Sequence, residues 1–234
     1  MKTISTAFKG YSPKVKAFFK DLKDNNNRDW FQEHKEFYEN EIKGTSQALV
    51  SDMAERFAML GMPYVADPKR SIFRIYRDIR FSPNKDPYKT NTGVFFPYSL
   101  HQTAKKPVES LGLYFHIDFK DTFIAGGIHM PPNDILKITR QRITEDWEEL
   151  DKILKSKTFK KEYPYSMVGE TLKKVPQGYP AEHPAADWLK LKEYTVYCDI
   201  DFKDTYTEGL MDILEKKAKA MAPFLEFFQV ALEN

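Results

Sequence analysis

The stretch LGLYFHIDFKDTFIAGGIHM, residues 111–130, decides the fold. Large apolar residues alternate with small or polar ones along its first part, which is the period-two pattern of a strand. A second strand-like run follows over residues 122–130. If Lys120 and Asp121 form a two-residue turn, Ile117 faces Ile124 and one face of the pair is wholly apolar. We therefore predict an antiparallel hairpin in the middle of the chain.

Helical patterns flank this hairpin on both sides. Before it, apolar residues repeat at the spacing of a buried helix face in segments that begin near Pro13, Asp29 and Thr45. After it, the expected helices begin at Asn133, at Thr144, at Thr207 (to about Met221) and at Pro223. A further strand is expected over residues 193–200.

The helices thus precede and follow a strand-rich middle, without a regular strand–helix alternation. This order predicts an α+β fold, in which a helical N-terminal part and C-terminal helices pack on a mainly antiparallel central sheet. No linker-like stretch interrupts the sequence, so we predict a single domain over residues 1–234.

The composition of the 234 residues narrows the class of protein. Hydrophobic residues make up 41%, enough for a sizeable core, and Lys plus Arg number 36 against 34 Asp plus Glu. This near balance argues against a nucleic-acid-binding protein, which usually has a basic excess. Neither a signal-peptide core nor an apolar run of membrane-spanning length is visible, so we expect no membrane contact and a cytoplasmic location. The sequence leaves the oligomeric state open.

The single cysteine, Cys198, excludes an internal disulfide and a cysteine-based metal site. Its neighbours Tyr194, Val196 and Ile200 are apolar at every second position. We therefore expect a buried thiol on a strand.

A second stretch, FRIYRDIRFSPNKDPYKT (73–90), places arginines among large apolar residues. Its β-branched and aromatic content favours an extended conformation over a helix. An arginine keeps its charge, so one that is buried needs an anion. If Asp78 or another internal carboxylate supplies that anion, the block is a structural ion-pair centre. If the anion is external, the block is a binding site.

The candidate ligand-binding residues are Arg74, Arg77, Arg80, Lys85, Tyr88 and Lys89. Guanidinium groups suit phosphate and carboxylate groups, so the preferred hypothesis is a site for an anionic small molecule, in a protein that could be an enzyme. No catalytic residue is established; the candidates are Asp78 and His183. The alternatives are a non-catalytic module that docks a protein or a nucleic-acid backbone, and a purely structural Arg block.

The histidines do not predict a metal site. In the hairpin above, His116 and His129 are separated by about 13 Å, too far for two ligands of one ion. No metal-binding spacing, Gly-rich dinucleotide motif or phosphate loop occurs, so we predict no cofactor. Tyr114, His116 and Asp118 share one strand face. They could form a strip of acid–base groups, but a polar outer face of the sheet is the commoner explanation of such a pattern. His183, between prolines, could anchor a loop or reach the site.

Five blocks of sequence occur in order along the chain: FFKDLKDNNNRDWFQEHKEFYEN (18–40), FRIYRDIRFSPNKDPYKTNTG (73–93), GGIHMPP (126–132), LKKVPQGYPAEHPAADWLKLKEYTV (172–196) and FLEFF (224–228). Together they resemble an uncharacterised family of bacterial and fungal proteins, domain of unknown function 2461. The resemblance covers nearly the whole chain and implies one family-wide, cytoplasmic domain. It implies no activity.

The family's pattern adds weight to particular positions. It matches Arg74, Arg77, Asp78, Arg80, Lys85, Pro87, Tyr88 and Lys89 in the second block, Gly126, Gly127 and His129 in the third, and Gly178, His183 and Pro184 in the fourth. Gln177 departs from the pattern, which usually has a basic residue there, so no basic contact is expected from this position.

Overall fold

The structure is a computed structural model that describes residues 8–100 and 111–233. The start of the chain that carried the signal-peptide argument, residues 1–7, lies outside the described part. Within it, four strands form one antiparallel sheet in the order β1-β2-β3-β4. The strands are β1 (Asn91–Pro97), β2 (Leu111–Asp118), β3 (Thr122–Ile128) and β4 (Tyr194–Asp199). The predicted α+β class is confirmed.

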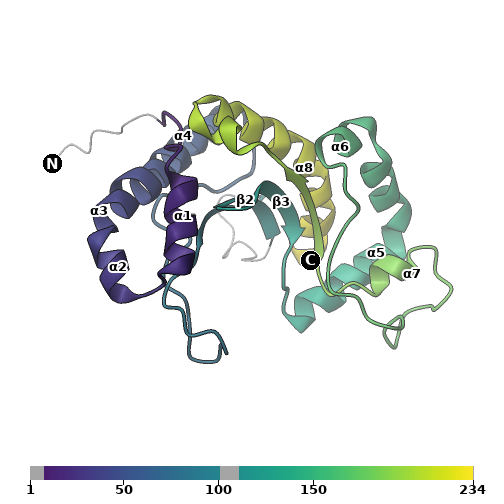
Figure 1. Cartoon of the computed structure of the whole chain (residues 1–234). Helices are drawn as coiled ribbons and strands as arrows, with labels where there is room; N and C mark the ends of the chain where they lie inside the picture. Colours follow the sequence, from purple (N-terminus) through teal and green to yellow (C-terminus); the bar gives the residue numbers. More distant parts are fainter. Residues whose placement is uncertain (1–7, 101–110, 234) are drawn as a thin grey trace. The chain divides into compact units, whose positions relative to one another are not determined.

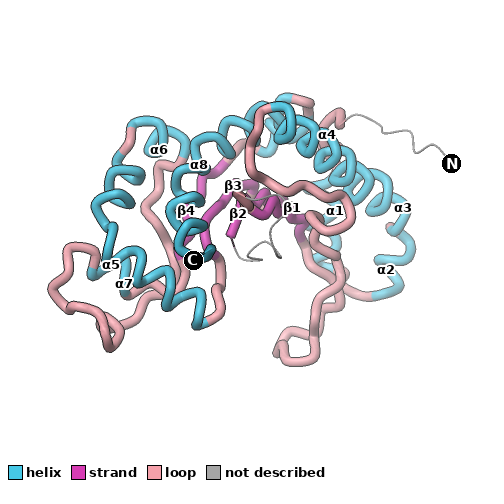
Figure 2. The backbone as a smooth tube through the Cα atoms, turned by 180° about the vertical axis from the view of Figure 1, so that it is seen from behind, coloured by secondary structure: helices cyan, strands magenta, loops and turns pink. Residues whose placement is uncertain are grey.

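Helices occupy much of the remaining chain (Figures 1 and 2). Before the sheet they are α1 (Val15–Asp24), α2 (Arg28–Glu33), α3 (Lys35–Phe37), a π-helical turn (Tyr38–Gly44) and α4 (Thr45–Met59). After β3 they are α5 (Asn133–Lys155), α6 (Lys157–Glu162), α7 (Ala186–Leu189), a 3-10 turn (Phe202–Tyr206) and α8 (Gly209–Glu233). None of the described helices combines the length and the apolar character needed to cross a membrane.

The chain divides into two compact units. The first comprises residues 1–96, 114–124 and 199–215, and the second comprises residues 97–113, 125–198 and 216–234. The division therefore passes through each of the four strands and through α8. The single domain over 1–234 stays a prediction.

In the first unit, α4 and the N-terminal segment cover strands of the sheet. Phe57 of α4 meets Phe96 of β1 edge to face, with ring centroids 5.4 Å apart. Tyr11 packs on Phe115 of β2, and its hydroxyl forms a hydrogen bond with the hydroxyl of Ser46. These rings are fully buried, and the removal of their large apolar surfaces from water stabilises the unit.

In the second unit, α8 packs on β3 and β4. Phe228 of α8 lies 5.6 Å from the ring of Tyr194 in β4. A Cβ atom at Gly126 of β3 would come within 2.6 Å of the methyl of Met221, so the helix approaches the strand closely there. Cys198 is buried in β4, as the alternating pattern predicts.

The predicted hairpin exists, but its predicted turn is wrong. The N–H of Asp118 donates to the carbonyl oxygen of Asp121, so Phe119 and Lys120 form the loop. The carboxylate of Asp118 also accepts the backbone N–H groups of Lys120 and Asp121, an Asx-type turn that decides the position. The observed turn therefore lies one residue earlier than predicted, and each residue of β2 pairs two positions earlier in β3 than predicted. Because side chains alternate with a period of two, this shift keeps the same residues on each face, and the predicted apolar face remains apolar.

The expected helix start at Pro223 is also wrong, because α8 runs through this proline. Thr207 caps the start of the helix, as predicted, by accepting the N–H of Gly209. Phe224 and Phe228 are fully buried just beyond the proline. Their burial offsets the backbone hydrogen bond that Pro223 cannot make. The expected new start near Thr144 appears as a kink inside α5, at Asp146.

Candidate functional site

Residues 72–94 form an extended antiparallel arm of the first unit, pink in Figure 2 where it precedes β1. Ile72 bridges Val94, and Tyr76 bridges Tyr88. The N–H of Lys89 donates to the carbonyl of Ile75 at 2.7 Å. The preference for an extended conformation over a helix is confirmed, although the bridges are isolated and form no continuous strand.

Tyr88 attaches this arm to the helices. The amide of Asn26 accepts the N–H of Tyr88 and donates to its carbonyl, at 3.1 and 3.0 Å. The Tyr88 ring stacks on Phe31 of α2, with centroids 4.1 Å apart, and is 6% exposed. Burial raises the pKa of its hydroxyl. Tyr88 thus holds the arm in place and presents little surface to a ligand.

Arg80 is paired with a carboxylate of the same arm, that of Asp78. Its Nε and Nη2 donate to the two carboxylate oxygens of Asp78, at 2.9 and 2.7 Å. These hydrogen bonds hold the pKa of Asp78 well below its usual range. The pair is solvent-exposed, so it contributes little to stability. Lys85 donates to the carbonyl of Ile79, at the same end of the arm.

Arg77 has a weaker internal partner. Its Nη1 lies 3.9 Å from Oδ2 of Asp86, at the limit of an ion pair. The side chain is 27% exposed and therefore partly desolvated. Arg77 is thus neither fully paired nor free.

Arg74 and Lys89 form a pair of like charges. Lys89 is half-buried, and its Nζ lies 5.2 Å from the centre of the Phe73 ring. Burial, and then the charge of Arg74, lower the pKa of Lys89. Neither cation has a carboxylate within 4 Å among residues 8–100 and 111–233. Asp78 still interacts with Arg74 over a longer distance. Arg74 and Lys89 are thus candidates of the Arg block without a carboxylate at ion-pair distance among the described residues.

The ring of Phe73 connects this pair to a hydrogen-bonded line on β2. Phe73 packs against Tyr114, with centroids 5.8 Å apart. The hydroxyl of Tyr114 is 2.9 Å from Nδ1 of His116, whose Nε2 is 3.4 Å from a carboxylate oxygen of Asp118. The three side chains that share one strand face are therefore in contact. Gly93 lies beneath Tyr114, where a Cβ atom would come within 2.5 Å of the hydroxyl.

The hydrogen bonds define the proton positions on this line. An ionised carboxylate only accepts, so Nε2 of His116 carries the proton and Nδ1 accepts from Tyr114. Burial lowers the pKa of His116, against the opposing effect of Asp118 and Asp121. Burial and Asp118 raise the pKa of Tyr114 to about 12. At neutral pH, His116 is a neutral base and Tyr114 a protonated acid.

The lowered pKa of His116 predicts a specific loss of stability in acid. Below about pH 6.5, the usual pKa of histidine, the unfolded chain binds a proton at this position that the folded chain does not. The free energy of unfolding should therefore fall as the pH is lowered from 7.5 to 5.5, and His116→Asn should make this fall shallower. Urea unfolding at several pH values measures the slope.

The matched control for this prediction is His34→Asn. His34 is exposed, immediately follows α2 and stacks on Trp30 with centroids 3.9 Å apart. The slope of the control should equal that of the unmodified protein. Equal slopes for all three proteins would contradict the assigned burial effect.

His183, the other catalytic candidate, is a loop anchor in the second unit. Its Nδ1 accepts the N–H of Ala185, so Nε2 carries the proton and donates to the carbonyl of Thr144 at 3.1 Å. The ring also meets Trp147 edge on. Both nitrogens are occupied by backbone groups, which leaves neither for a ligand.

The sequence matches the model of a protein family described as conserved hypothetical protein (DUF2461) over residues 14–227. The chain belongs to this family. The resemblance predicted from the five sequence blocks is thereby confirmed. No match was found among curated proteins or among solved structures.

The extended arm and the Tyr114–His116–Asp118 line both lie inside the region matched by DUF2461. Nδ1 of His129, which the third block also includes, lies 2.6 Å from a carboxylate oxygen of Glu193. Among the described residues, no three His, Cys, Asp or Glu side chains gather where they could hold a metal ion.

Proposed function

We propose that the protein binds a small anionic molecule, bearing a phosphate or carboxylate group, at Arg74 and Lys89. The observation that carries the proposal is the position of the Lys89 amine. It is half-buried against Phe73 and beside Arg74, with no carboxylate at ion-pair distance among the described residues. We also propose a cytoplasmic location, where the ligand would be a soluble metabolite.

The charges of the arm support this choice of residues. Asp78 is already bound through both oxygens to Arg80, so it cannot also pair fully with Arg74. An anion between Arg74 and Lys89 would offset their mutual repulsion and raise the pKa of Lys89. Arg74 would supply a planar set of donors, and Lys89 a point charge. Arg77, Arg80, Lys85 and Tyr88 would then shape the arm around the ligand.

The Tyr114–His116–Asp118 line favours a second candidate function, an enzyme that acts on the bound anion. Tyr114 would take a proton from the substrate while passing its own proton to Nδ1 of His116, and Asp118 would stabilise the resulting imidazolium. The geometry supports this transfer because the hydroxyl and Nδ1 are 2.9 Å apart. Phe73 packs against Tyr114 and lies near the Lys89 amine, so it would place Tyr114 beside the bound ligand.

Inorganic phosphate and citrate should bind the unmodified protein at low ionic strength, and Lys89→Met or Arg74→Gln should weaken the binding of each probe at least tenfold. Methionine keeps the apolar stem against Phe73, so the loss would report the charge. Binding should also decline as the pH rises through the lowered pKa of Lys89, where the amine loses its proton. Isothermal titration calorimetry at pH 7 and pH 10 measures both effects.

Arg80→Gln is the matched control, because Arg80 lies on the same arm and is already paired with Asp78. It should bind both probes as the unmodified protein does. Equal losses in all three variants would contradict the proposal. Binding of an oligonucleotide that weakens steeply with salt would instead favour the non-catalytic module.

A further inference from the structure

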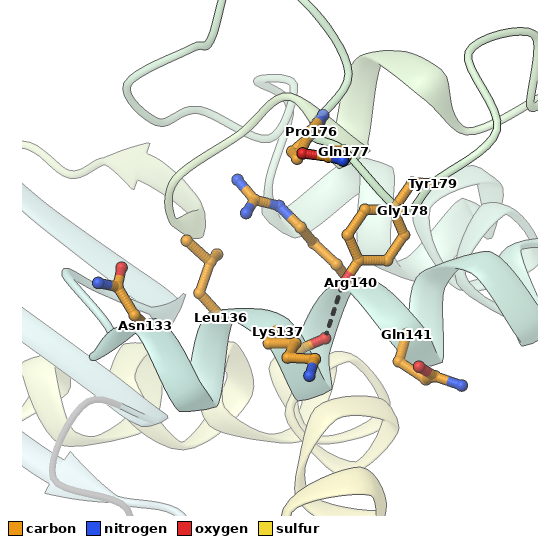
Figure 3. A pocket seen from close by; sticks show the side chains of 9 residues that line it. All are labelled: Asn133, Leu136, Lys137, Arg140, Gln141, Pro176, Gln177, Gly178 and Tyr179. Atoms are coloured by element: carbon orange, nitrogen blue, oxygen red, sulfur yellow. Dashed lines mark hydrogen bonds between the residues drawn. The ribbon is translucent and has the colours of Figure 1, made fainter.

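A cavity of about 350 Å³ lies in the second unit, between α5 and the segment that contains Gly178 (Figure 3). Small-molecule sites commonly measure about 300–1,000 Å³, so its size suits a metabolite of a few carbon atoms. The basic groups in its lining are Lys137 and Arg140, and the neutral polar groups include Asn133 and Gln177. None of the described residues that line it is acidic.

Arg140 is a buried cation without an acidic partner. Its side chain is on the buried stripe of α5, four residues after Leu136 and three before Ile143, and the residue is 8% exposed. Its Nε and Nη2 donate to the carbonyls of Leu189 and Leu191, both at 2.9 Å. Among the described residues no carboxylate forms an ion pair with it, and backbone carbonyls carry only partial charges.

The guanidinium retains donors for a ligand. It carries five N–H groups, of which the two backbone carbonyls occupy two. The guanidinium also faces the hydroxyl of Tyr194, so up to three of its five N–H groups have partners within the chain. Figure 3 shows the side chain extending from α5 into the space between Leu136 and Gln177. The charged group therefore forms part of the cavity wall.

The exposed rim adds a second positive charge. Lys137 is exposed, one helical turn before Arg140, so both side chains lie on the same side of α5. The hydroxyl of Tyr179 donates to the carbonyl of Lys137 at 3.2 Å, which attaches the segment around Gly178 to the helix. The cavity thus has a buried cation, Arg140, an exposed cation, Lys137, and a wall that Tyr179 attaches to the helix.

We propose that this cavity is a second anion-binding site, which takes a small dianion bearing carboxylate or phosphate groups. Arg140 binds one anionic group at the buried end, and Lys137 binds the other at the rim. The amide of Gln177 contacts the neutral part of the ligand. The site does not depend on Arg74 and Lys89, because every residue in it belongs to the second unit.

The test measures the affinity of the full chain for succinate and for inorganic phosphate, by calorimetry and by the rise in Tm. Lys137→Gln should weaken the binding of the preferred probe at least tenfold at this site. Lys152→Gln, an exposed lysine on the same helix, should leave it unchanged. Lys89→Met should also leave this site unchanged, which separates it from the arm. Preference for succinate or for phosphate decides which anionic group the site recognises.

Arg140 requires a separate variant, because its bonds to Leu189 and Leu191 also stabilise the fold. Arg140→Lys keeps the charge but loses the planar donor set, and it should lose affinity at least tenfold while circular dichroism shows a folded protein. If it unfolds, the Lys137→Gln comparison decides alone. Absence of binding by the unmodified protein, or equal affinities for Lys137→Gln and Lys152→Gln, would overturn the proposal.

Discussion

Gly127→Ala should lower the free energy of unfolding by more than about 4 kcal/mol, or prevent folding altogether. Gly127 has a φ of 128°, in the region that favours glycine. A Cβ atom there would be 1.9 Å from the carbonyl oxygen of Tyr194 and 3.1 Å from the ring of Phe224. The backbone of Tyr194 belongs to β4 and cannot move away without disrupting the sheet. Urea unfolding, or the soluble yield, measures the loss.

Gly61→Ala is the control that separates backbone strain from steric clash. Gly61 also has a positive φ, of 60°, but a Cβ atom there would meet nothing within 4 Å. Its cost should therefore be about 1–2 kcal/mol, the strain of a left-handed residue alone. If Gly127→Ala costs no more than Gly61→Ala, the close approach to Tyr194 is not a constraint.

Glu162→Gln should cost about 3 kcal/mol at neutral pH, the usual penalty for removing one partner from a buried ion pair. Glu162 ends α6 and is 4% exposed. Its oxygens lie 2.8 Å from Nζ of Lys216 and 3.2 Å from Nζ of Lys217. Lys217 is itself largely buried, so the substitution leaves its charge without a counter-charge. Chemical denaturation at pH 7 measures the difference.

The same substitution should lose its effect in acid. Burial alone would raise the pKa of Glu162, but the hydrogen bonds from Lys216 and Lys217 outweigh it and lower the pKa from 4.5. A lowered carboxyl pKa stabilises the fold above the unfolded value, and this stabilisation disappears as the pH falls through the folded value. The free energies of the two proteins should therefore converge as the pH falls through the lowered pKa of Glu162.

Glu170→Gln provides the matched comparison in the same unit. Glu170 pairs with Lys192 at 2.5 Å, but its side chain is 72% exposed. Water screens such a pair, so its loss should cost well under 1 kcal/mol. Similar losses for Glu162→Gln and Glu170→Gln would show that burial of the first pair has no energetic consequence.

Much of the fold could be predicted from periodicity. The apolar faces of the hairpin and of α1 and α4 follow local patterns, and burial enforces them. The turn could not be predicted, because the side chain of Asp118 captures two backbone N–H groups that a pattern of hydrophobicity does not register. The continuity of α8 through Pro223 depends on the buried rings beyond it, which is a tertiary effect.

For the candidate site, the sequence could predict which residues belong to it but not the role of each. Sequence placed Arg74, Arg77 and Arg80 in one block, but their partners decide their roles. Asp78 binds Arg80, and Asp86 lies only at the edge of reach of Arg77. Distances of this kind follow from the folded arm, so no spacing rule distinguishes the three arginines.

Arg140 was missed, although a signal for it exists. It stands four residues after Leu136 and three before Ile143, and is thus a charged residue on an apolar helical stripe. A cation at such a position is expensive to bury and needs a partner. The carbonyls that receive it come from residues 189 and 191, which are about 50 positions away in the sequence.

The burial of Cys198 in β4 means that the reactivity of its thiol can report local unfolding of the sheet. The chain has one thiol, and it is 3% exposed. A thiol reagent can reach the sulfur only when β4 separates from its neighbours, so the labelling rate follows the population of that open state. Alkylation followed by mass spectrometry can therefore measure how a ligand changes the local stability of the sheet, without an engineered probe.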